Sequence, residues 1–194
     1  MRIVGGMWRG RAIEAPEGRG TRPTTDRMRE SLASMVLSAK DLDISGCSVL
    51  DAFAGSGGVG LELLSRGAKR CTFCDKDRRA AAVVKRNCVS LGVPKGAWDV
   101  LPVDAFGIAQ RSTVAGAPFD IVFLDPPYAL DGQRVAELVD SLATAGLLSV
   151  DCLVVYERAS ADEGVVPKSC VPLRSKKHGG TTVDLYGREP NHGA

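Results

Sequence analysis

Val49-Leu50-Asp51-Ala52-Phe53-Ala54-Gly55-Ser56-Gly57-Gly58-Val59-Gly60 is the most informative stretch of this 194-residue chain for its architecture. A short apolar run leads into a glycine-rich turn, and Leu61, Leu63 and Leu64 then begin an apolar helix. Glycines let the backbone approach a ligand closely at the N-terminus of a helix, which a Cβ would prevent. The stretch therefore predicts a strand, a turn and a helix that bind a nucleotide-like ligand.

The rest of the chain repeats this alternation. We expect strands near residues 48–53, 70–74, 98–103, 119–124 and 151–157, and helices near 58–66, 77–91, 104–110 and 131–145. Strands that alternate with helices form a parallel, doubly wound sheet that binds ligands at the carboxyl ends of its strands. Residues 176–186 have the pattern of a hairpin that adds an antiparallel strand. The predicted fold is therefore α/β, with a doubly wound, mostly parallel, seven-stranded sheet.

The front of the chain is expected to add a small extension. Residues 1–15 alternate around Gly5-Gly6 and Arg9-Gly10 as a β-hairpin does, and residues 16–23 form a loop. Thr24 or Thr25 is suited to cap a following helix. The apolar stripe of that helix is Met28, Leu32, Met35 and Val36. We therefore divide the chain into a basic hairpin-and-loop extension (1–23), a main domain (24–189) and a loose tail (190–194).

The glycine turn alone leaves two cofactors open. Gly55, Gly57 and Gly60 satisfy the dinucleotide pattern G-x-G-x-x-G, and Asp75 follows at the distance of a ribose-binding acid, so an NAD site is one interpretation. Asp51 favours another, because a carboxylate beside the turn repels a pyrophosphate but attracts the cationic amino group of S-adenosylmethionine. We expect cofactor contacts from Asp51, Phe53, Gly55, Gly57, Gly60, Asp75, Lys76, Asp104 and Ala105.

Asp104 has two interpretations. It closes the strand expected at 98–103, where its carboxylate could hold an adenine amino group beside Ala105 and Phe106. An N-cap of the next helix explains it at least as well, since Asp is a preferred capping residue.

Asp125-Pro126-Pro127-Tyr128 follows the apolar run Phe119–Leu124 and carries the most specific chemistry. A conjugated exocyclic amine is a poor nucleophile, because its lone pair is delocalised into the ring. The Asp125 carboxylate and the Pro126 carbonyl could accept both of its N–H groups and favour charge developing on the nitrogen. The prolines would hold these acceptors rigidly, and Tyr128 would stack on the base. A proline-rich turn without catalytic function is the alternative.

Together these strand ends resemble the class I S-adenosylmethionine-dependent methyltransferases that modify exocyclic amines. The N-terminal runs Arg2-Ile3-Val4-Gly5-Gly6, Arg9-Gly10-Arg11 and Thr21–Leu32 narrow the resemblance to the bacterial 16S ribosomal RNA guanine-N2-methyltransferase family of the RsmD type. The resemblance covers nearly the whole chain. It implies a Rossmann-like methyltransferase fold, S-adenosylmethionine as cofactor, catalysis by Asp125 to Tyr128, and 16S ribosomal RNA of the small subunit as substrate. Asp75 departs from the family pattern, which often has Glu, but the shorter acid should still reach a ribose.

An uneven charge distribution fits an RNA partner. The net charge of the chain is only +2. Residues 1–40 hold eight Lys or Arg and four acids, a net charge of +4, so the remaining residues have a net charge of −2. The arginine guanidinium binds phosphates with two hydrogen bonds and stacks on bases. For any single arginine, however, a solvated charged surface is the simpler explanation. The expected RNA contacts are Arg2, Arg9, Arg11, Arg22, Arg27 and Arg29.

Other classes of protein have less support. Cys71-x-x-Cys74 has no second pair, and on a strand its side chains would point to opposite faces, so we expect no metal. The chain has only two histidines, and it lacks an apolar run long enough to span a membrane. We expect a cytoplasmic monomer that does not bind membranes. Three alternatives stay open: methylation of adenine or cytosine in DNA or RNA, methylation of a protein glutamine, and an NAD-dependent oxidoreductase or non-catalytic nucleotide-binding module.

Overall fold

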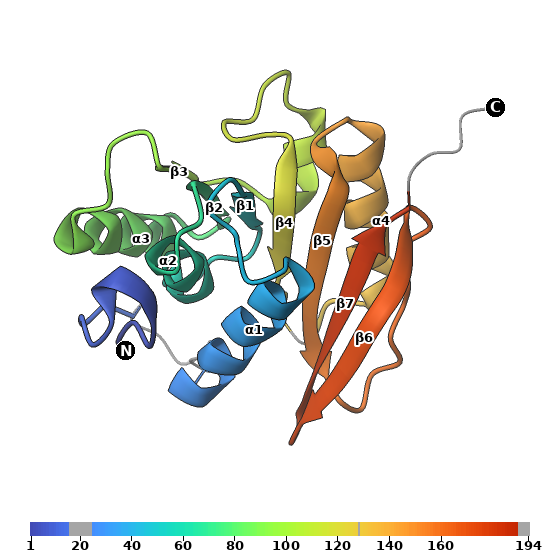
Figure 1. Ribbon diagram of the computed structural model, residues 1–194. Helices are drawn as coiled ribbons and strands as arrows, with labels where there is room; N and C mark the ends of the chain where they lie inside the picture. Colours follow the sequence, from blue (N-terminus) through green and yellow to red (C-terminus); the bar gives the residue numbers. More distant parts are fainter. Residues whose placement is uncertain (16–24, 128, 190–194) are drawn as a thin grey trace.

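The computed structural model describes residues 1–15, 25–127 and 129–189 and shows one sheet with helices on both faces (Figure 1). The strands are β1 (Ser48–Asp51), β2 (Arg70–Cys74), β3 (Trp98–Leu101), β4 (Phe119–Leu124), β5 (Leu148–Ala159), β6 (Cys170–His178) and β7 (Thr181–Arg188). The helices are α1 (Asp26–Ala39), α2 (Gly58–Ser65), α3 (Arg78–Leu91) and α4 (Gly132–Thr144). Two 3-10 helices are η1 (Gly6–Trp8) and η2 (Ala105–Gln110).

The seven strands lie in the order β3-β2-β1-β4-β5-β7-β6. The first five are parallel neighbours, and β7 is antiparallel to both β5 and β6. The predicted doubly wound, mostly parallel sheet is therefore confirmed, including its C-terminal hairpin. After β3 the chain crosses back over β1 to form β4, so the strand order reverses between β1 and β4. Ligands of such sheets bind at the carboxyl ends of the strands beside this reversal.

Two apolar cores fill the space above and below the sheet. One joins α1, α2 and α3 to side chains such as Val49, Phe73 and Phe123, and the other joins α4 and η2 to Leu50 and Val122. Cys71 belongs to the first core and Cys74 to the second, although both lie on β2. The two thiols therefore lie on opposite faces, as the sequence predicted. All six cysteines are free.

The expected N-terminal β-hairpin is reduced to one isolated antiparallel bridge, between Arg2 and Ala12, with η1 between them. Ile3, Trp8 and Ile13 are buried in the same core as α1 and α2. At Gly6, where φ is +73°, a Cβ would come within 1.9 Å of the Ser65 carbonyl oxygen. The segment therefore packs closely against the end of α2. Residues 1–15 therefore pack onto the main domain through Ile3, Trp8 and Ile13.

The N-cap and the apolar stripe predicted for α1 are confirmed, whereas two other predicted elements differ in type or length. Thr25 caps α1, accepting the Met28 N–H at 3.2 Å, and the stripe Met28, Leu32, Met35 and Val36 is buried. The helix expected at 104–110 is the 3-10 helix η2, and the C-terminal hairpin is longer than expected. In the described part of the chain, no helix is long and apolar enough to cross a membrane.

Candidate functional site

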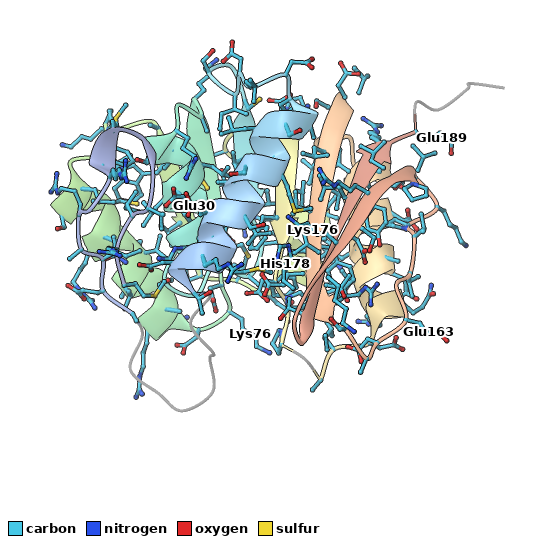
Figure 2. The ribbon with its side chains drawn as sticks, turned by 60° about the horizontal axis from the view of Figure 1, so that its bottom comes forward. Glu30, Lys76, Glu163, Lys176, His178 and Glu189 are labelled. Carbon is cyan, nitrogen blue, oxygen red and sulfur yellow. The ribbon has the colours of Figure 1, made fainter. Side chains whose placement is uncertain are left out.

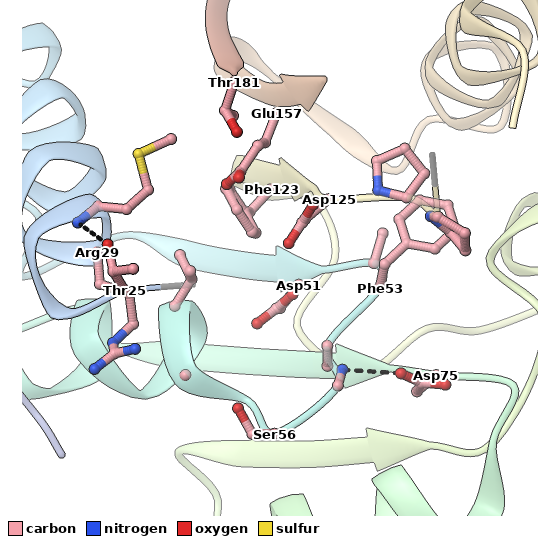
Figure 3. Close-up of a pocket in the computed structure, with 18 of the residues that line it drawn as sticks. Thr25, Arg29, Asp51, Phe53, Ser56, Asp75, Phe123, Asp125, Glu157 and Thr181 are labelled. Carbon is pink, nitrogen blue, oxygen red and sulfur yellow. Dashed lines mark hydrogen bonds between the residues drawn. The ribbon is translucent and has the colours of Figure 1, made fainter. Parts of the chain in front are cut away.

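A pocket of about 1320 Å³ opens at the carboxyl ends of the parallel strands (Figure 3). Its walls come from the loops after β1 to β4, from β5, from the start of α1 and from the β6–β7 hairpin. The lining residues that the sequence predicted as cofactor or catalytic contacts are Asp51, Phe53, Gly55, Asp75, Lys76, Asp104, Ala105, Asp125, Pro126 and Pro127. Folding therefore brings together acids from four different strand ends.

Of the three glycines in the G-x-G-x-x-G pattern, Gly55 lines the pocket. Its φ is +54°, and a Cβ built there would have no heavy atom within 4 Å. Its N–H donates to Asp75 Oδ2 at 2.8 Å, and Asp75 Oδ1 accepts the Asp77 N–H, also at 2.8 Å. These bonds fix the Asp75 carboxylate beside the turn, at the end of β2.

Gly57 and Gly60, expected to let the backbone approach a ligand, do not belong to the described lining of the pocket. Gly57 caps α2 with a φ of +77°. A Cβ on Gly60 would come within 2.4 Å of the Phe73 ring and 2.6 Å of the Cys71 sulfur. The close packing of α2 on β1 and β2 therefore explains why position 60 is a glycine, and its contact with a cofactor stays a prediction.

Asp51 ends β1 with only 1% of its surface exposed. Its Oδ2 accepts the Gly60 N–H at 3.1 Å. The pKa of this carboxyl is raised to about 7, chiefly by burial; the Gly60 bond lowers it, and the nearby charges of Asp125 and Asp75 add to the rise. A positively charged ligand would favour the ionised form of Asp51.

Asp104 caps η2, because its Oδ1 accepts the Phe106 N–H at 3.0 Å. The capping interpretation is therefore confirmed, and the side chain also lines the pocket with Ala105 and Phe106. The guanidinium of Arg134 lies 5.0 Å from the centre of the Phe106 ring. This contact packs Arg134 of α4 against Phe106, which lines the pocket.

Asp125 follows β4 directly and faces the pocket together with Pro126 and Pro127. Burial raises the pKa of the Asp125 carboxyl to about 6. The carboxyl therefore takes up a proton more readily than an exposed aspartate does. Tyr128, expected to stack on the base, lies outside the described residues.

Sequence reasoning missed residues from β5 and the β6–β7 hairpin. Glu157 of β5 is 7% exposed and lines the pocket, as does Thr181 of β7. Lys176, Lys177 and His178 line the pocket, and His178 Nε2 lies 3.4 Å from Ser31 Oγ of α1, so this end of the hairpin lies beside that helix (Figure 2). An acid at the end of the expected strand 151–157 was a signal for Glu157. The hairpin lysines gave none, because only sheet order brings them to the site.

The arginines expected to bind RNA divide into several groups. Arg9 is exposed, Arg11 is exposed and donates to the Ser90 carbonyl, and Arg22 lies outside the described residues. Arg27 is exposed at the pocket. Arg2, also exposed, pairs with a carboxylate of α1, as described next.

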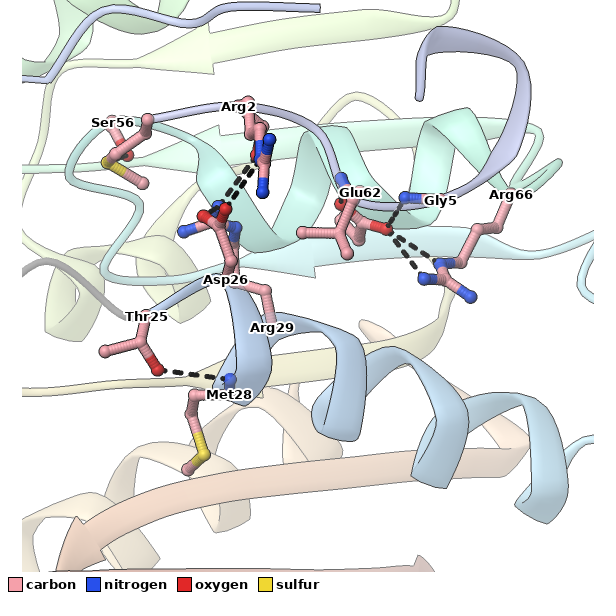
Figure 4. A network of polar contacts seen from close by, with 11 residues as sticks. Arg2, Gly5, Thr25, Asp26, Met28, Arg29, Ser56, Glu62 and Arg66 are labelled. Atoms are coloured by element: carbon pink, nitrogen blue, oxygen red, sulfur yellow. Dashed lines mark hydrogen bonds and ion pairs between the residues drawn. The ribbon is translucent and has the colours of Figure 1, made fainter. Parts of the chain in front are cut away.

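Arg29 is the exception, because it is 1% exposed (Figure 4). Its guanidinium donates to the Arg2 carbonyl at 2.7 Å and to Asp26 at 2.6 Å. Arg2 pairs with the same Asp26 carboxylate at 2.8 Å. The Arg29 side chain is enclosed and ties the N-terminal segment to α1, and the residue also contributes to the pocket lining, so its contact with RNA stays a prediction.

The site therefore combines an acidic interior with a basic rim. Such an interior can hold a cationic ligand, and its carboxylates can accept hydrogen bonds from an amine. Within residues 1–15, 25–127 and 129–189, no three His, Cys, Asp or Glu side chains are grouped to hold a metal ion.

Comparisons with known proteins agree over nearly the whole length. The chain matches the model of the family described as Conserved hypothetical protein 95 over residues 1–187. It is 35% identical over 192 residues to "Ribosomal RNA small subunit methyltransferase D" of Escherichia coli (strain K12), spanning 97% of this chain and 90% of that one. The protein of the same name from Haemophilus influenzae is 31% identical, spanning 96% and 93%. The solved structure "Putative methyltransferase yhhF from Escherichia coli" superposes with a TM-score of 0.82 at 34% identity, spanning 98% and 99%.

Proposed function

Because this chain belongs to the Conserved hypothetical protein 95 family, whose members include ribosomal RNA small subunit methyltransferase D, we propose that it methylates 16S ribosomal RNA. The reaction transfers a methyl group from S-adenosylmethionine to the exocyclic N2 amine of a guanine. The resemblance of the N-terminal runs to the RsmD type carries the choice of guanine N2. The observation that supports this reaction is that Gly55, after β1, and Asp125, after β4, line the same pocket.

The pocket has room for a cofactor and a base side by side across the reversal of strand order. Gly55, Asp75 and Asp104 follow β1, β2 and β3 on one side. Asp125 and its prolines follow β4 on the other side, next to β5. We assign the first half to the cofactor and the second to the RNA base.

The cofactor half suits S-adenosylmethionine better than NAD. Asp51 and Asp75 place negative charge where NAD would need its pyrophosphate, whereas the amino group and sulfur of S-adenosylmethionine are positive. Asp75 would hold the ribose hydroxyls through the lone pairs that Gly55 and Asp77 leave open. Calorimetric titration should detect binding of S-adenosylmethionine and none of NAD.

Asp125 supplies the main chemical contribution of the chain. When bound, S-adenosylmethionine offers a methyl group on a positively charged sulfur, which becomes neutral as the methyl leaves. The Asp125 carboxylate accepts an N–H of the amine and stabilises the positive charge that develops on nitrogen. It can then take the proton that the methylated nitrogen releases. The remaining catalysis is alignment of the two reactants.

The basic rim would hold the RNA backbone. The pocket is acidic inside, but four exposed cations lie at its mouth: Arg27, Lys76, Lys176 and Lys177. The N-terminal segment adds two more exposed positive charges, Arg9 and Arg11. Cations at the rim attract phosphates, while the base itself must swing out of its stack to enter the pocket.

The substrate proposed is a small-subunit particle in the cytoplasm and not naked RNA. Phosphate contacts orient RNA but carry little sequence information, so one guanine is best selected when ribosomal proteins already present it. Methyl incorporation should be compared on naked 16S RNA, on assembly intermediates and on small subunits from cells that lack this protein. Equal rates on all three would contradict this part of the proposal.

Mass spectrometry of ribosomal RNA nucleosides tests the function as a whole. Cells without the protein should lose one N2-methylguanosine from 16S RNA, and the purified protein should restore it. An unchanged nucleoside profile would reject the proposed function.

A further inference from the structure

Glu157 lies beside Asp125 on the neighbouring strand. The register of β4 and β5 pairs Leu124 with Tyr156, so Asp125, which directly follows β4, lies one position beyond this pair, beside Glu157 of β5. Side chains at paired positions of parallel strands point to the same face, about 5 Å apart. Figure 3 shows both carboxylates directed into the pocket. Both residues line it.

Glu157 lies on the base side of the pocket. The sheet order places β5 beyond β4, away from β1 and β2, which carry Gly55 and Asp75. Thr181 of β7 closes this side, and Figure 3 places it next to Glu157. Glu157 is 7% exposed, so its side chain is largely shielded from open solvent.

Two adjacent carboxylates suit one arrangement of hydrogen-bond donors. Guanine carries the N1–H and the N2 amine side by side on its pairing edge. Adenine and cytosine carry an amine next to a ring nitrogen that has a lone pair and no hydrogen. An ionised carboxylate only accepts hydrogen bonds, so it would bind the guanine edge and repel the other two.

We propose that Glu157 accepts the N1–H of the target guanine while Asp125 accepts the N2 amine, so that Glu157 selects guanine. This inference rests on the proposed function and adds a specificity-determining residue to it. A site built to accept a hydrogen bond rejects an analogue that presents a lone pair in place of the donor, because two acceptors repel each other.

2-Aminopurine is the direct probe. It keeps the amine at the same ring position but has a bare N1 with a lone pair. Small-subunit particles would be reconstituted with 16S RNA in which synthetic RNA, joined by ligation, carries 2-aminopurine at the methylated position. The unaltered protein should methylate guanine at least about 100-fold faster, by kcat/KM, than 2-aminopurine. Comparable rates on the two bases would overturn the inference without any substitution.

Glu157→Gln supplies the second arm, because its amide can donate a hydrogen bond to the bare N1. The variant should lose activity on guanine while its preference for guanine over 2-aminopurine falls by about 10-fold or more. Its affinity for S-adenosylmethionine, measured by calorimetry, should be unchanged, which also verifies folding. Glu163→Gln makes the same chemical change at an exposed position after β5 and should keep the original preference.

The two levels of proposal fail differently. If the unaltered protein formed no N2-methylguanine on any particle, the proposed function would be rejected. If it formed N2-methylguanine and the preference of Glu157→Gln matched that of the unaltered protein, only the role of Glu157 would be wrong.

Discussion

The carboxylate of Glu62 accepts the backbone N–H of Gly5 at 2.7 Å, which ties the N-terminal segment to α2 (Figure 4). The other carboxylate oxygen accepts the Val4 N–H at 2.8 Å, and Arg66 pairs with the first at 2.9 Å. The Glu62 side chain is only 1% exposed. The start of the chain is therefore anchored by an enclosed charge next to the site.

Glu62→Ala should lower the free energy of unfolding by about 3–5 kcal/mol, because it leaves two amides and a guanidinium without their acceptor. Urea denaturation would measure this loss. Glu137→Ala on α4 removes an exposed partner 3.5 Å from Arg134 and should cost less than about 1 kcal/mol. Equal losses would contradict the anchoring role. For the same reason, deleting residues 1–20 should unfold the protein instead of separating RNA binding from cofactor binding.

Asp125→Ala should slow methyl transfer by about 100-fold or more, since it removes a preorganised acceptor of the reacting amine. Its affinity for S-adenosylmethionine should stay nearly unchanged, because Asp125 lies on the base side of the pocket. Single-turnover kinetics and calorimetry measure the two quantities separately. Normal turnover in this variant would reject the amine-binding role.

Asp75→Ala should have the opposite effect and weaken S-adenosylmethionine binding by about 10-fold or more. The substitution removes the acceptor expected for the ribose and frees the Gly55 N–H that now bonds to Asp75. At saturating cofactor, turnover should largely recover. A defect that persists at saturation would place Asp75 in the chemical step instead.

Cofactor affinity should rise as the pH rises through about 7. Burial raises the pKa of Asp51 to about 7, so this carboxyl loses its proton across that range. A cationic cofactor favours the ionised form, and affinity is therefore lost as the pH falls. Calorimetry across this range measures the effect. Asp51→Asn should flatten the part of the profile near pH 7, and an unchanged profile would exclude Asp51 as its source.

Replacing both Lys176 and Lys177 by Ala should weaken RNA binding and make it less sensitive to salt. Each phosphate contact contributes about −0.7 to the slope of log binding constant against log salt concentration. The double variant removes two such contacts, so the steepness of its slope should fall by about 1.4. The full protein, with roughly three to five contacts, should have a slope of about −2 to −3.5. Lys69→Ala with Lys95→Ala is the matched control, because these exposed lysines precede β2 and β3 at the other end of the sheet. A larger effect of the control pair would place the RNA surface elsewhere.

The sequence by itself determined the alternation of strands and helices and the acids that end the strands. Asp51, Asp75, Asp104 and Asp125 could be placed together because the carboxyl ends of parallel strands meet at one edge, whatever the details of packing. The capping of α1 by Thr25 was also local, since an N-cap depends on residues three positions apart.

Only the tertiary structure decided which of these residues face a ligand. Gly55 and Gly60 are equivalent in the sequence pattern, yet one opens to the pocket and the other packs against Phe73. Arg29 is enclosed because the N-terminal segment folds over it, and Glu157 reaches Asp125 only through the register of β4 and β5. Such placements depend on contacts between residues far apart in the chain, and periodicity along the sequence carries no record of them.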